Sequence, residues 1–384
     1  MIDVRELPER PRILVITLRR IGDVLLTTPL IRVLRQAFPQ ATLDMLVYAG
    51  SDEILKGNPD IDRVLTVLQR QSFGQTLALA GRLLRRYDLA ISTQAGDRPT
   101  FLAWLAGRRR IGLVPCKGEF GAHWKSWMYN CAVHAEPSNH RVDELLRLAG
   151  ALGLDGRPGI VCPQGASIDR LAPQTPYAVL HASPMYRYKQ WTADGWRALA
   201  KELAARQISV VATGGPDAAE RAYLDAVWGA SDVPVARLEG KLDWPQLAAL
   251  LAGAAVYVGP DTSVTHLAAG TGCPTVALYG PTDPRLWGPW PAGGLAPSWA
   301  ATGRIQQRGN VWLVQNALPC TPCQKEGCDR RIDSHSQCLD ELPVRQVLTA
   351  VDQALAWSRE REGGWRSGKK IGMEGHMPLP SVTP

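Results

Sequence analysis

The chain has 384 residues, of which 45% are hydrophobic and 21% charged; this is the composition of an ordinary globular protein long enough for two domains. No run of about 18 apolar residues occurs, which excludes a bilayer-spanning helix. The first twelve residues, MIDVRELPERPR, are charged and lack the apolar segment of a signal peptide, so we expect a cytoplasmic protein.

The formal net charge of +7 is unevenly distributed along the chain. Residues 1–170 hold 23 Lys and Arg against 17 Asp and Glu, whereas residues 171–384 hold 20 against 19. A basic N-terminal half favours an anionic partner there, such as nucleic acid, a phosphorylated glycolipid or a membrane surface. The same excess is equally compatible with an ordinary hydrophilic surface.

Strands and helices alternate through the first half of the chain. The pattern predicts strands at 12–17, 42–48, 64–68 and 89–93 with another entering at Arg108, and helices at 24–37, 74–86 and 141–152. Strands that alternate with helices indicate a parallel sheet wound by crossovers. The stretch 158–176 contains several Pro and Gly without periodicity, and we expect it to link two domains.

The same alternation restarts in the second half. It predicts strands at 177–183, 208–215, 255–260 and 274–280, and helices at 191–206, 216–227, 244–252, from 265 and at 342–359. We therefore expect an α/β protein with two Rossmann-like, doubly wound domains facing a central cleft. The expected divisions are 1–172, 173–342, a C-terminal helix at 343–361 and a disordered tail at 362–384.

Motifs at the carboxyl ends of strands carry most weight, because ligands of open α/β sheets bind there. The chain has neither G-x-G-x-x-G nor G-x-x-x-x-G-K-[ST], which disfavours a dinucleotide oxidoreductase or a P-loop enzyme. The first strand is followed by Arg19-Arg20-Ile21-Gly22-Asp23. Asp23 is either a helix N-cap, the commoner role of Asp, or a carboxylate placed to take a proton from a hydroxyl group.

Two polar segments follow strands in the second half. Ser183 and Lys189 precede a helix, where a hydroxyl, an ammonium group and backbone N–H donors can hold a diphosphate; Lys189 can also be a surface lysine. The run Asp261, Thr262, Ser263 and His266 opens a helix and favours a sugar or phosphate site. Asp261 as a helix cap and His266 as a core histidine are the alternatives.

Four cysteines gather near the C-terminus with the spacing C-x2-C-x4-C-x9-C. They are Cys320, Cys323, Cys328 and Cys338. Thiolate clusters of this kind often hold zinc or iron, and a reducing cytosol favours metal over disulfides. The alternative is four free thiols in a loop.

Several of these segments together resemble glycosyltransferase family 9, the lipopolysaccharide heptosyltransferase family. They are residues 21–47, Lys189-x-Trp191, residues 259–284 and the cysteine-rich end. The resemblance extends from Arg12 to Trp357, with the motifs in order. The cysteine segment most resembles the heptosyltransferase III type, which adds a branch heptose to the inner core.

This resemblance implies a GT-B fold and inverting transfer of heptose from ADP-L-glycero-β-D-manno-heptose to the inner core of lipopolysaccharide. It implies that catalysis needs no metal, so any zinc or iron is structural. The N-terminal domain would bind the acceptor and the C-terminal domain the nucleotide sugar. The partners would be ADP-heptose, a phosphorylated core acceptor and the inner face of the cytoplasmic membrane, to which the enzyme would be peripheral.

Individual roles follow from the same resemblance. Asp23 would be the general base, and Lys189 would offset charge on the leaving ADP. The implied donor-binding residues are Ser183, Lys189, Glu220 at the ribose, Asp261 at sugar hydroxyls, and Thr262, Ser263 and His266 around the diphosphate and heptose. Arg19, Arg20 and Arg98 are candidates for acceptor phosphates or carboxylates.

The sequence departs from the family pattern at two places, and other functions stay open. Ser263 stands where many members have Gly, and Met185–Tyr188 replace hydroxyl and acidic residues near the lysine. Another nucleotide sugar or a protein acceptor are therefore alternatives. A non-catalytic nucleotide-binding scaffold would be expected to lack Asp23 or Lys189. We expect no nucleic acid partner, because no aromatic stacking pattern or recognition motif accompanies the basic half.

Overall fold

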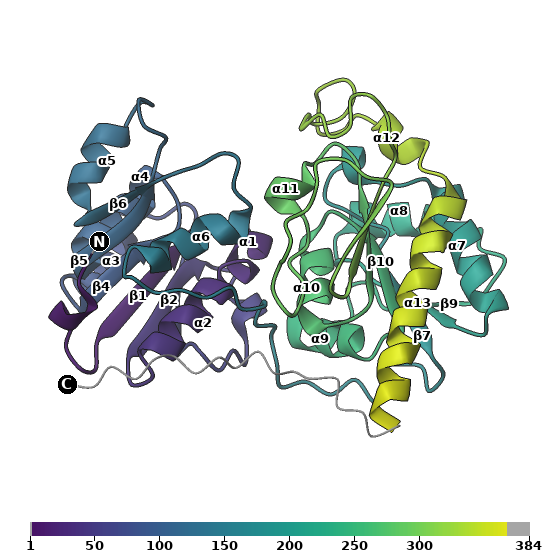
Figure 1. Cartoon of the computed structure of the whole chain (residues 1–384), viewed down its shortest axis with the longest axis horizontal. Coiled ribbons are helices and arrows are strands. Elements are labelled where there is room, and N and C mark those ends of the chain that lie inside the picture. Colours follow the sequence, from purple (N-terminus) through teal and green to yellow (C-terminus); the bar gives the residue numbers. More distant parts are fainter. Residues whose placement is uncertain (1, 367–384) are drawn as a thin grey trace.

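The apolar segment Ile13–Ile16 is completely buried and forms the middle of a six-stranded sheet in the first of two lobes. The computed structural model describes residues 2–366, and Figure 1 shows the two lobes side by side. The sheet has the order β3-β2-β1-β4-β5-β6, and all its strands are parallel. Its strands are β1 (Arg12–Thr17), β2 (Thr42–Tyr48), β3 (Arg63–Val67), β4 (Tyr87–Ser92), β5 (Gly107–Val114) and β6 (Cys131–His134).

Helices cover both faces of this first sheet. They are α1 (Ile21–Leu25), α2 (Thr28–Ala37), α3 (Phe73–Leu83), α4 (Asp97–Ala106), α5 (Ala122–Met128) and α6 (Arg141–Gly150), with short 3-10 turns at Val4–Glu6 and Glu53–Leu55. The sequence did not predict α4, α5 or β6. Helix α4 is as long as α2 but lacks a clear division into apolar and polar faces, and α5 opens after a loop with two left-handed glycines, Gly118 and Gly121.

The single helix expected at 24–37 is two helices, and proline is the reason. Pro29 has no backbone N–H with which to bond the carbonyl of Leu25, so a continuous helix would lose that bond. The Thr28 hydroxyl donates to the Leu25 carbonyl instead, at 2.8 Å, and the Thr27 hydroxyl donates to the Asp23 carbonyl, also at 2.8 Å. The break leaves α1 as a separate short helix beside the second lobe (Figure 1).

The second lobe has a seven-stranded sheet of order β12-β13-β11-β10-β7-β8-β9, parallel except for the antiparallel edge pair β12 and β13. Its strands are β7 (Tyr177–Leu180), β8 (Ser209–Ala212), β9 (Val235–Arg237), β10 (Val256–Pro260), β11 (Thr275–Tyr279), β12 (Ile305–Arg308) and β13 (Val311–Gln315). Counted from β7, the parallel strands repeat the order of the first sheet. Strands β9, β12 and β13 are short or follow irregular segments, and the sequence did not predict them.

The helices of the second lobe are α7 (Ala193–Ala205), α8 (Ala218–Trp228), α9 (Trp244–Ala252), α10 (Ser263–Thr271), α11 (Pro284–Trp287), α12 (Gln337–Asp340) and α13 (Val344–Arg366), with a 3-10 turn at Arg187–Lys189. Helix α13 packs across strands β10, β11 and β13. It runs five residues into the predicted disordered tail, and residues 367–384 of that tail lie outside the described residues.

Two Rossmann-ordered lobes that face one cleft form the GT-B fold, so the expected fold class is confirmed. Residues 151–176 contain neither helix nor strand, and the boundary expected at 172/173 lies in this segment; it stays a prediction. Among residues 2–366, no helix is both long and apolar enough to cross a membrane.

Candidate active site

A cavity of about 780 Å³ lies between the lobes, a size typical of small-molecule sites. Among the described residues of the first lobe, a single segment around α1 lines this cavity. The second lobe contributes the loops that follow β7, β8, β9 and β10. Because strand order reverses between β7 and β10, their carboxyl ends form the crevice in which such sheets bind ligands. The predicted residues lining it are Arg20, Asp23, Ser183, Lys189, Glu220, Asp261, Thr262, Ser263 and His266.

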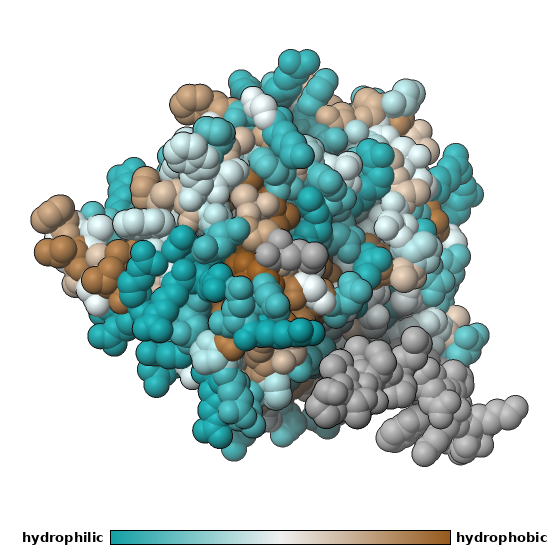
Figure 2. Space-filling view, turned by 60° about the vertical axis from the view of Figure 1, so that its left-hand side comes forward, coloured by the Kyte–Doolittle hydropathy of each residue, from teal (hydrophilic) through white to brown (hydrophobic). Residues whose placement is uncertain are grey.

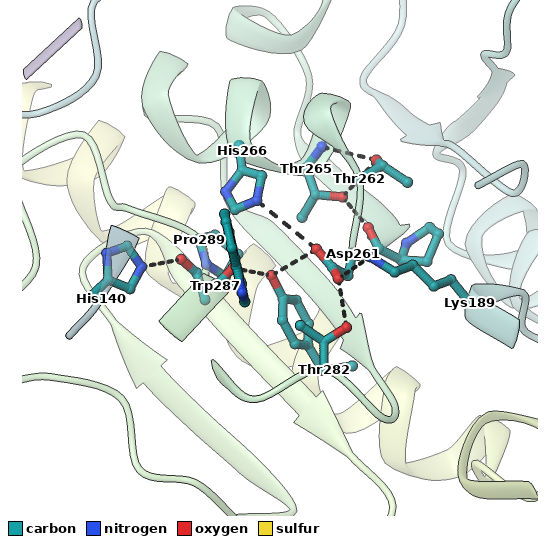
Figure 3. A network of polar contacts seen from close by, with 12 residues as sticks. His140, Lys189, Asp261, Thr262, Thr265, His266, Thr282, Trp287 and Pro289 are labelled. Atoms are coloured by element: carbon teal, nitrogen blue, oxygen red, sulfur yellow. Dashed lines mark hydrogen bonds and ion pairs between the residues drawn. The ribbon is translucent and has the colours of Figure 1, made fainter. Parts of the chain in front are cut away.

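Asp261, directly after β10, is the centre of a buried polar network (Figure 3). Lys189 Nζ lies 2.5 Å from its Oδ2 atom, and the Thr282 hydroxyl donates to the same oxygen at 2.7 Å. The Tyr279 hydroxyl is 3.4 Å from Oδ1, and His266 Nε2 is 4.0 Å from it. Tyr279 is the last residue of β11 and Thr282 lies in the turn that follows it; the sequence analysis named neither as a site residue.

Opposite charges set the protonation of this network. Burial lowers the pKa of Lys189, but the Asp261 carboxylate raises it more, so the pKa lies above its ordinary value. Burial raises the pKa of Asp261, but Lys189 and His266 lower it below its ordinary value. Both groups are therefore charged at neutral pH. Burial lowers the pKa of His266, with Asp261 and Asp23 opposing, so this ring is neutral.

Helix α10 begins at the floor of the cavity. Its N-cap is Thr262, whose hydroxyl accepts from the Thr265 N–H at 3.4 Å, so the N-cap role considered for Asp261 is wrong. The other N–H groups of the first turn can meet an anion. Gly22 of α1 approaches this turn so closely that an added Cβ would lie 3.4 Å from Ser263 Cβ. The two lobes thus meet where α1 and α10 begin.

Asp23 faces the same cavity from the first lobe. The N-cap interpretation is wrong for this residue too, because the cap position of α1 is Arg20 and no side chain caps it. Asp23 Oδ1 lies 3.4 Å from Arg141 Nε and 3.6 Å from Arg19 Nη1, close enough for ion pairs but not aligned as hydrogen bonds. The carboxylate is therefore held between two guanidinium groups beside the cavity.

Arg141 is a site residue that the sequence analysis missed. Its side chain is 10% exposed, and it donates to the Thr93 carbonyl at the end of β4. Burial lowers the pKa of Arg141, and Asp23 opposes this. A cation in the first turn of a helix opposes the helix dipole. That unfavourable position, at the start of α6, was the one available signal that Arg141 has a specific anionic partner.

The nucleotide side of the cavity follows β7 and β8. Ser183 is buried and lines the cavity. Glu220 lies in the first turn of α8, where its Oε1 accepts from the Gly215 N–H at 2.7 Å. A Cβ added to Gly215 would lie 2.5 Å from Glu220 Oε2, so a side chain at this position would displace the Glu220 carboxylate. Glu220 therefore has a fixed position at the cavity wall.

The three arginines expected to meet the acceptor occupy different places. Arg20 lines the cavity and stacks over the Tyr186 ring of the other lobe at 5.4 Å. Arg19 contacts Asp23 and is half exposed. Arg98 does not line the cavity; its guanidinium donates to the Gln69 carbonyl and the Gln71 side chain. Contact of these arginines with an acceptor stays a prediction.

His140 joins the lobes beside this site (Figure 3). Its Nδ1 atom accepts from the Val142 N–H at 3.2 Å, so Nε2 carries the proton and donates to the Gly288 carbonyl at 2.8 Å. Burial lowers the pKa of His140 to about 4. The bond from the Val142 N–H therefore requires a neutral ring, whereas the Gly288 carbonyl can accept from the ring in either protonation state.

The four C-terminal cysteines lie in the loop before and within α12. Burial, and after it the neighbouring thiols of Cys323, Cys320 and Cys328, raise the pKa of Cys338 to about 11. Nevertheless, within the described part of the chain no three Cys, His, Asp or Glu side chains are grouped to hold a metal. The described arrangement therefore does not fit a metal, and zinc or iron here stays a prediction.

Comparison with known proteins gives concordant matches. The sequence model of glycosyltransferase family 9 (heptosyltransferase) matches residues 76–329. Lipopolysaccharide heptosyltransferase 3 of Escherichia coli K12 is 27% identical over 87% of this chain and 95% of that protein. Lipopolysaccharide heptosyltransferase 1 of Pseudomonas aeruginosa is 30% identical over 88% of this chain and 93% of its own length.

Solved structures give the same fold. The structure of E. coli heptosyltransferase WaaC with ADP superposes with a TM-score of 0.67 and 22% identity, covering 89% of this chain and 99% of that one. The same enzyme with ADP-2-deoxy-2-fluoro heptose gives a TM-score of 0.65 at 21% identity and the same coverage.

Proposed function

The chain belongs to glycosyltransferase family 9, and we propose that it transfers a heptose from ADP-heptose to the inner core of lipopolysaccharide with inversion at the anomeric carbon. The observation that carries this proposal is the placement of Asp23 in one lobe opposite the Lys189–Asp261 pair in the other, across a single cavity. The relatives' names and the ADP and ADP-heptose analogue in WaaC support the donor.

The proposed reaction needs one base and one site for the leaving group. An acceptor hydroxyl attacks the anomeric carbon of the heptose, Asp23 takes the hydroxyl proton, and the bond to the ADP phosphate breaks. Attack from the face opposite ADP inverts the anomeric centre. Arg141 and Arg19 orient the Asp23 carboxylate by ion pairs of 3.4 and 3.6 Å.

The diphosphate of the donor would lie between Lys189 and the first turn of α10. A charged lysine and free N–H groups stabilise the negative charge that grows on the leaving ADP. Asp261 holds Lys189 in the cavity and can exchange this contact for a sugar hydroxyl when the donor binds. Since these groups supply the positive charge, we propose that catalysis needs no metal.

Glu220 and the loops after β8 and β9 would meet the nucleoside. We further propose that the enzyme works at the inner face of the cytoplasmic membrane, where a lipid-linked acceptor is available. A branch heptose is the proposed product, because heptosyltransferase 3 of E. coli is similar over most of both chains.

The decisive experiment compares two donors and two acceptors. Turnover is measured with ADP-heptose and with UDP-glucose, on lipopolysaccharide from a core-truncated strain and on intact lipopolysaccharide. We expect transfer from ADP-heptose to the truncated core. Faster transfer from UDP-glucose, or no transfer to any lipopolysaccharide acceptor, would overturn the proposal.

A further inference from the structure

Helices α3, α4 and α5 are neighbours on one side of the first sheet, and their outer surface carries large exposed apolar side chains. Phe73 is 84% exposed, Phe120 is fully exposed and Trp127 is 79% exposed. Leu77, Phe101 and Trp104 are also more than 40% exposed. We call these six side chains the apolar face. In Figure 2, where the first lobe comes forward, hydrophobic side chains protrude at the edge of the molecule beside hydrophilic ones.

Helix α3 shows that this exposure is unusual. Its sequence, FGQTLALAGRL, is apolar around most of its circumference, yet only Leu79 and Leu83 are buried. Large apolar side chains of a helix normally face the core, whereas Phe73 and Leu77 of α3 face solvent. Exposed contiguous apolar surface on a folded protein marks an interaction site. The sequence and burial of α3 therefore indicate that something covers it.

The apolar face is continuous across the three helices. Arg98 at the start of α4 bonds to Gln71, two residues before Phe73, and so ties α4 to the start of α3. Phe101, one turn after Arg98, stacks on Trp124 of α5 with ring centroids 5.6 Å apart. The exposed side chains therefore form one surface rather than isolated positions.

Basic residues accompany the apolar face. Residues 68–130 contain ten Lys and Arg against three Asp and Glu, an excess of seven, which equals the net charge of the whole chain. Arg70 precedes Phe73, and Lys117 precedes Phe120 in the loop between β5 and α5. Both are exposed, and within residues 2–366 their side chains form no hydrogen bond or ion pair. Their charge is available to an external partner.

We propose that the apolar face docks on an anionic lipid bilayer. Aromatic side chains that insert at the headgroup level, with lysine and arginine beside anionic headgroups, are what such a surface binds. A second copy of the chain would bring the same excess of positive charge against itself, which disfavours self-association through this face.

The position of the apolar face suits the proposed function, on which this assignment of a partner partly rests. The loops before α3, α4 and α5 leave the carboxyl edge of the first sheet, and the segment with Asp23 leaves the same edge. A bilayer that contacts these loops would present a lipid-linked acceptor toward the cavity.

Vesicle binding tests this inference without turnover, so it can fail separately from the proposed function. Full-length protein is sedimented with vesicles of phosphatidylcholine alone and with vesicles that also contain phosphatidylglycerol. We expect binding only to the anionic vesicles. Arg70→Glu with Lys117→Glu should weaken it at least about 25-fold, since each basic residue near an anionic surface contributes roughly fivefold.

Two further variants complete the design. Phe73→Ser with Phe120→Ser should weaken vesicle binding at least about tenfold, and because both side chains are exposed, the fold should be unaffected. Lys201→Glu with Arg345→Glu makes the same charge change on exposed positions of the second lobe and should bind as the wild type does. Absence of wild-type binding, equal losses in both charge variants, or a wild-type dimer that Phe73→Ser with Phe120→Ser dissociates would overturn the proposal.

Discussion

The two lobes have the same strand order but use their strand ends differently. In the second lobe, four loops converge on the cavity, and Lys189, Asp261 and His266 form a dense buried network there. Among the described residues of the first lobe, only the segment at α1 lines the cavity, and its charged groups there are Asp23 and Arg20. The strand order is therefore shared, and the lobes differ at the cavity in the chemistry of their loops.

The lobes also differ at their outer surfaces. The second lobe covers its sheet with α13, whose apolar side packs on β10, β11 and β13. The first lobe leaves the large apolar side chains of α3, α4 and α5 exposed. The exposed apolar surface therefore belongs to the lobe that, in the proposed function, receives the lipid-linked acceptor.

The largest expected effect is on turnover, when the proposed general base of the first lobe, Asp23, is replaced. Asp23→Asn should lower turnover by about 10²–10⁴-fold, the usual contribution of a general base, because the amide cannot accept the acceptor's proton. Turnover with saturating donor measures it. Asp155→Asn, the same change at an exposed position of this lobe, should leave turnover unchanged. Near wild-type turnover in Asp23→Asn would remove the assignment of Asp23 as base.

The contact between the lobes should depend on pH. The pKa of His140 is about 4 in the folded chain and 6.5 when unfolded, so the unfolded state binds the proton first as the pH falls. The free energy of unfolding should therefore decrease by about 3 kcal/mol between pH 6.5 and 4 on account of this residue. Urea unfolding across this range measures it.

His140→Asn keeps an acceptor for the Val142 N–H but does not titrate. In this variant the free energy of unfolding should no longer show the decrease of about 3 kcal/mol between pH 6.5 and 4. His123→Asn, at an exposed position, should keep that decrease. An unchanged pH profile in His140→Asn would mean that protonation of His140 does not loosen the contact between the lobes.

The smallest effect should come from metal removal. A chelator should change turnover by less than about twofold, since Lys189 and α10 meet the diphosphate charge. Elemental analysis of untagged protein tests the cysteine cluster separately. About one equivalent of zinc or iron would support the spacing-based prediction, and less than about a tenth of an equivalent would leave free thiols, as the described arrangement has them. Loss of turnover on chelation would contradict metal-independent catalysis.

The regular parts of the fold could be predicted from sequence because strands such as Arg12–Thr17 are continuous apolar runs and helix α9 has clear ends. Helix α5 and strand β9 could not, since they are too short for periodicity to show. The break between α1 and α2 is consistent with Pro29, which lies inside the single helix predicted at 24–37.

The site was predicted at the residues that stand in polar strand-end turns. Arg141 and Tyr279 were missed because their roles depend on contacts between segments far apart in the chain. Arg98 was included for its charge alone, and the fold uses that charge to hold the loop before α3. Pairwise geometry of this kind is fixed by tertiary packing, which a single sequence does not display.

ADP affinity tests most directly the central proposal that the second lobe binds the donor nucleotide and the first lobe does not. Calorimetric titration is made with the wild type, Lys189→Ala, Asp23→Asn and Arg98→Ala. Loss of the charge-assisted contact should weaken ADP binding of Lys189→Ala by about tenfold to a hundredfold, equivalent to about 1.5–3 kcal/mol. Asp23→Asn and Arg98→Ala, both in the first lobe, should bind ADP as the wild type does. Equal weakening in Lys189→Ala and either first-lobe variant would contradict the account.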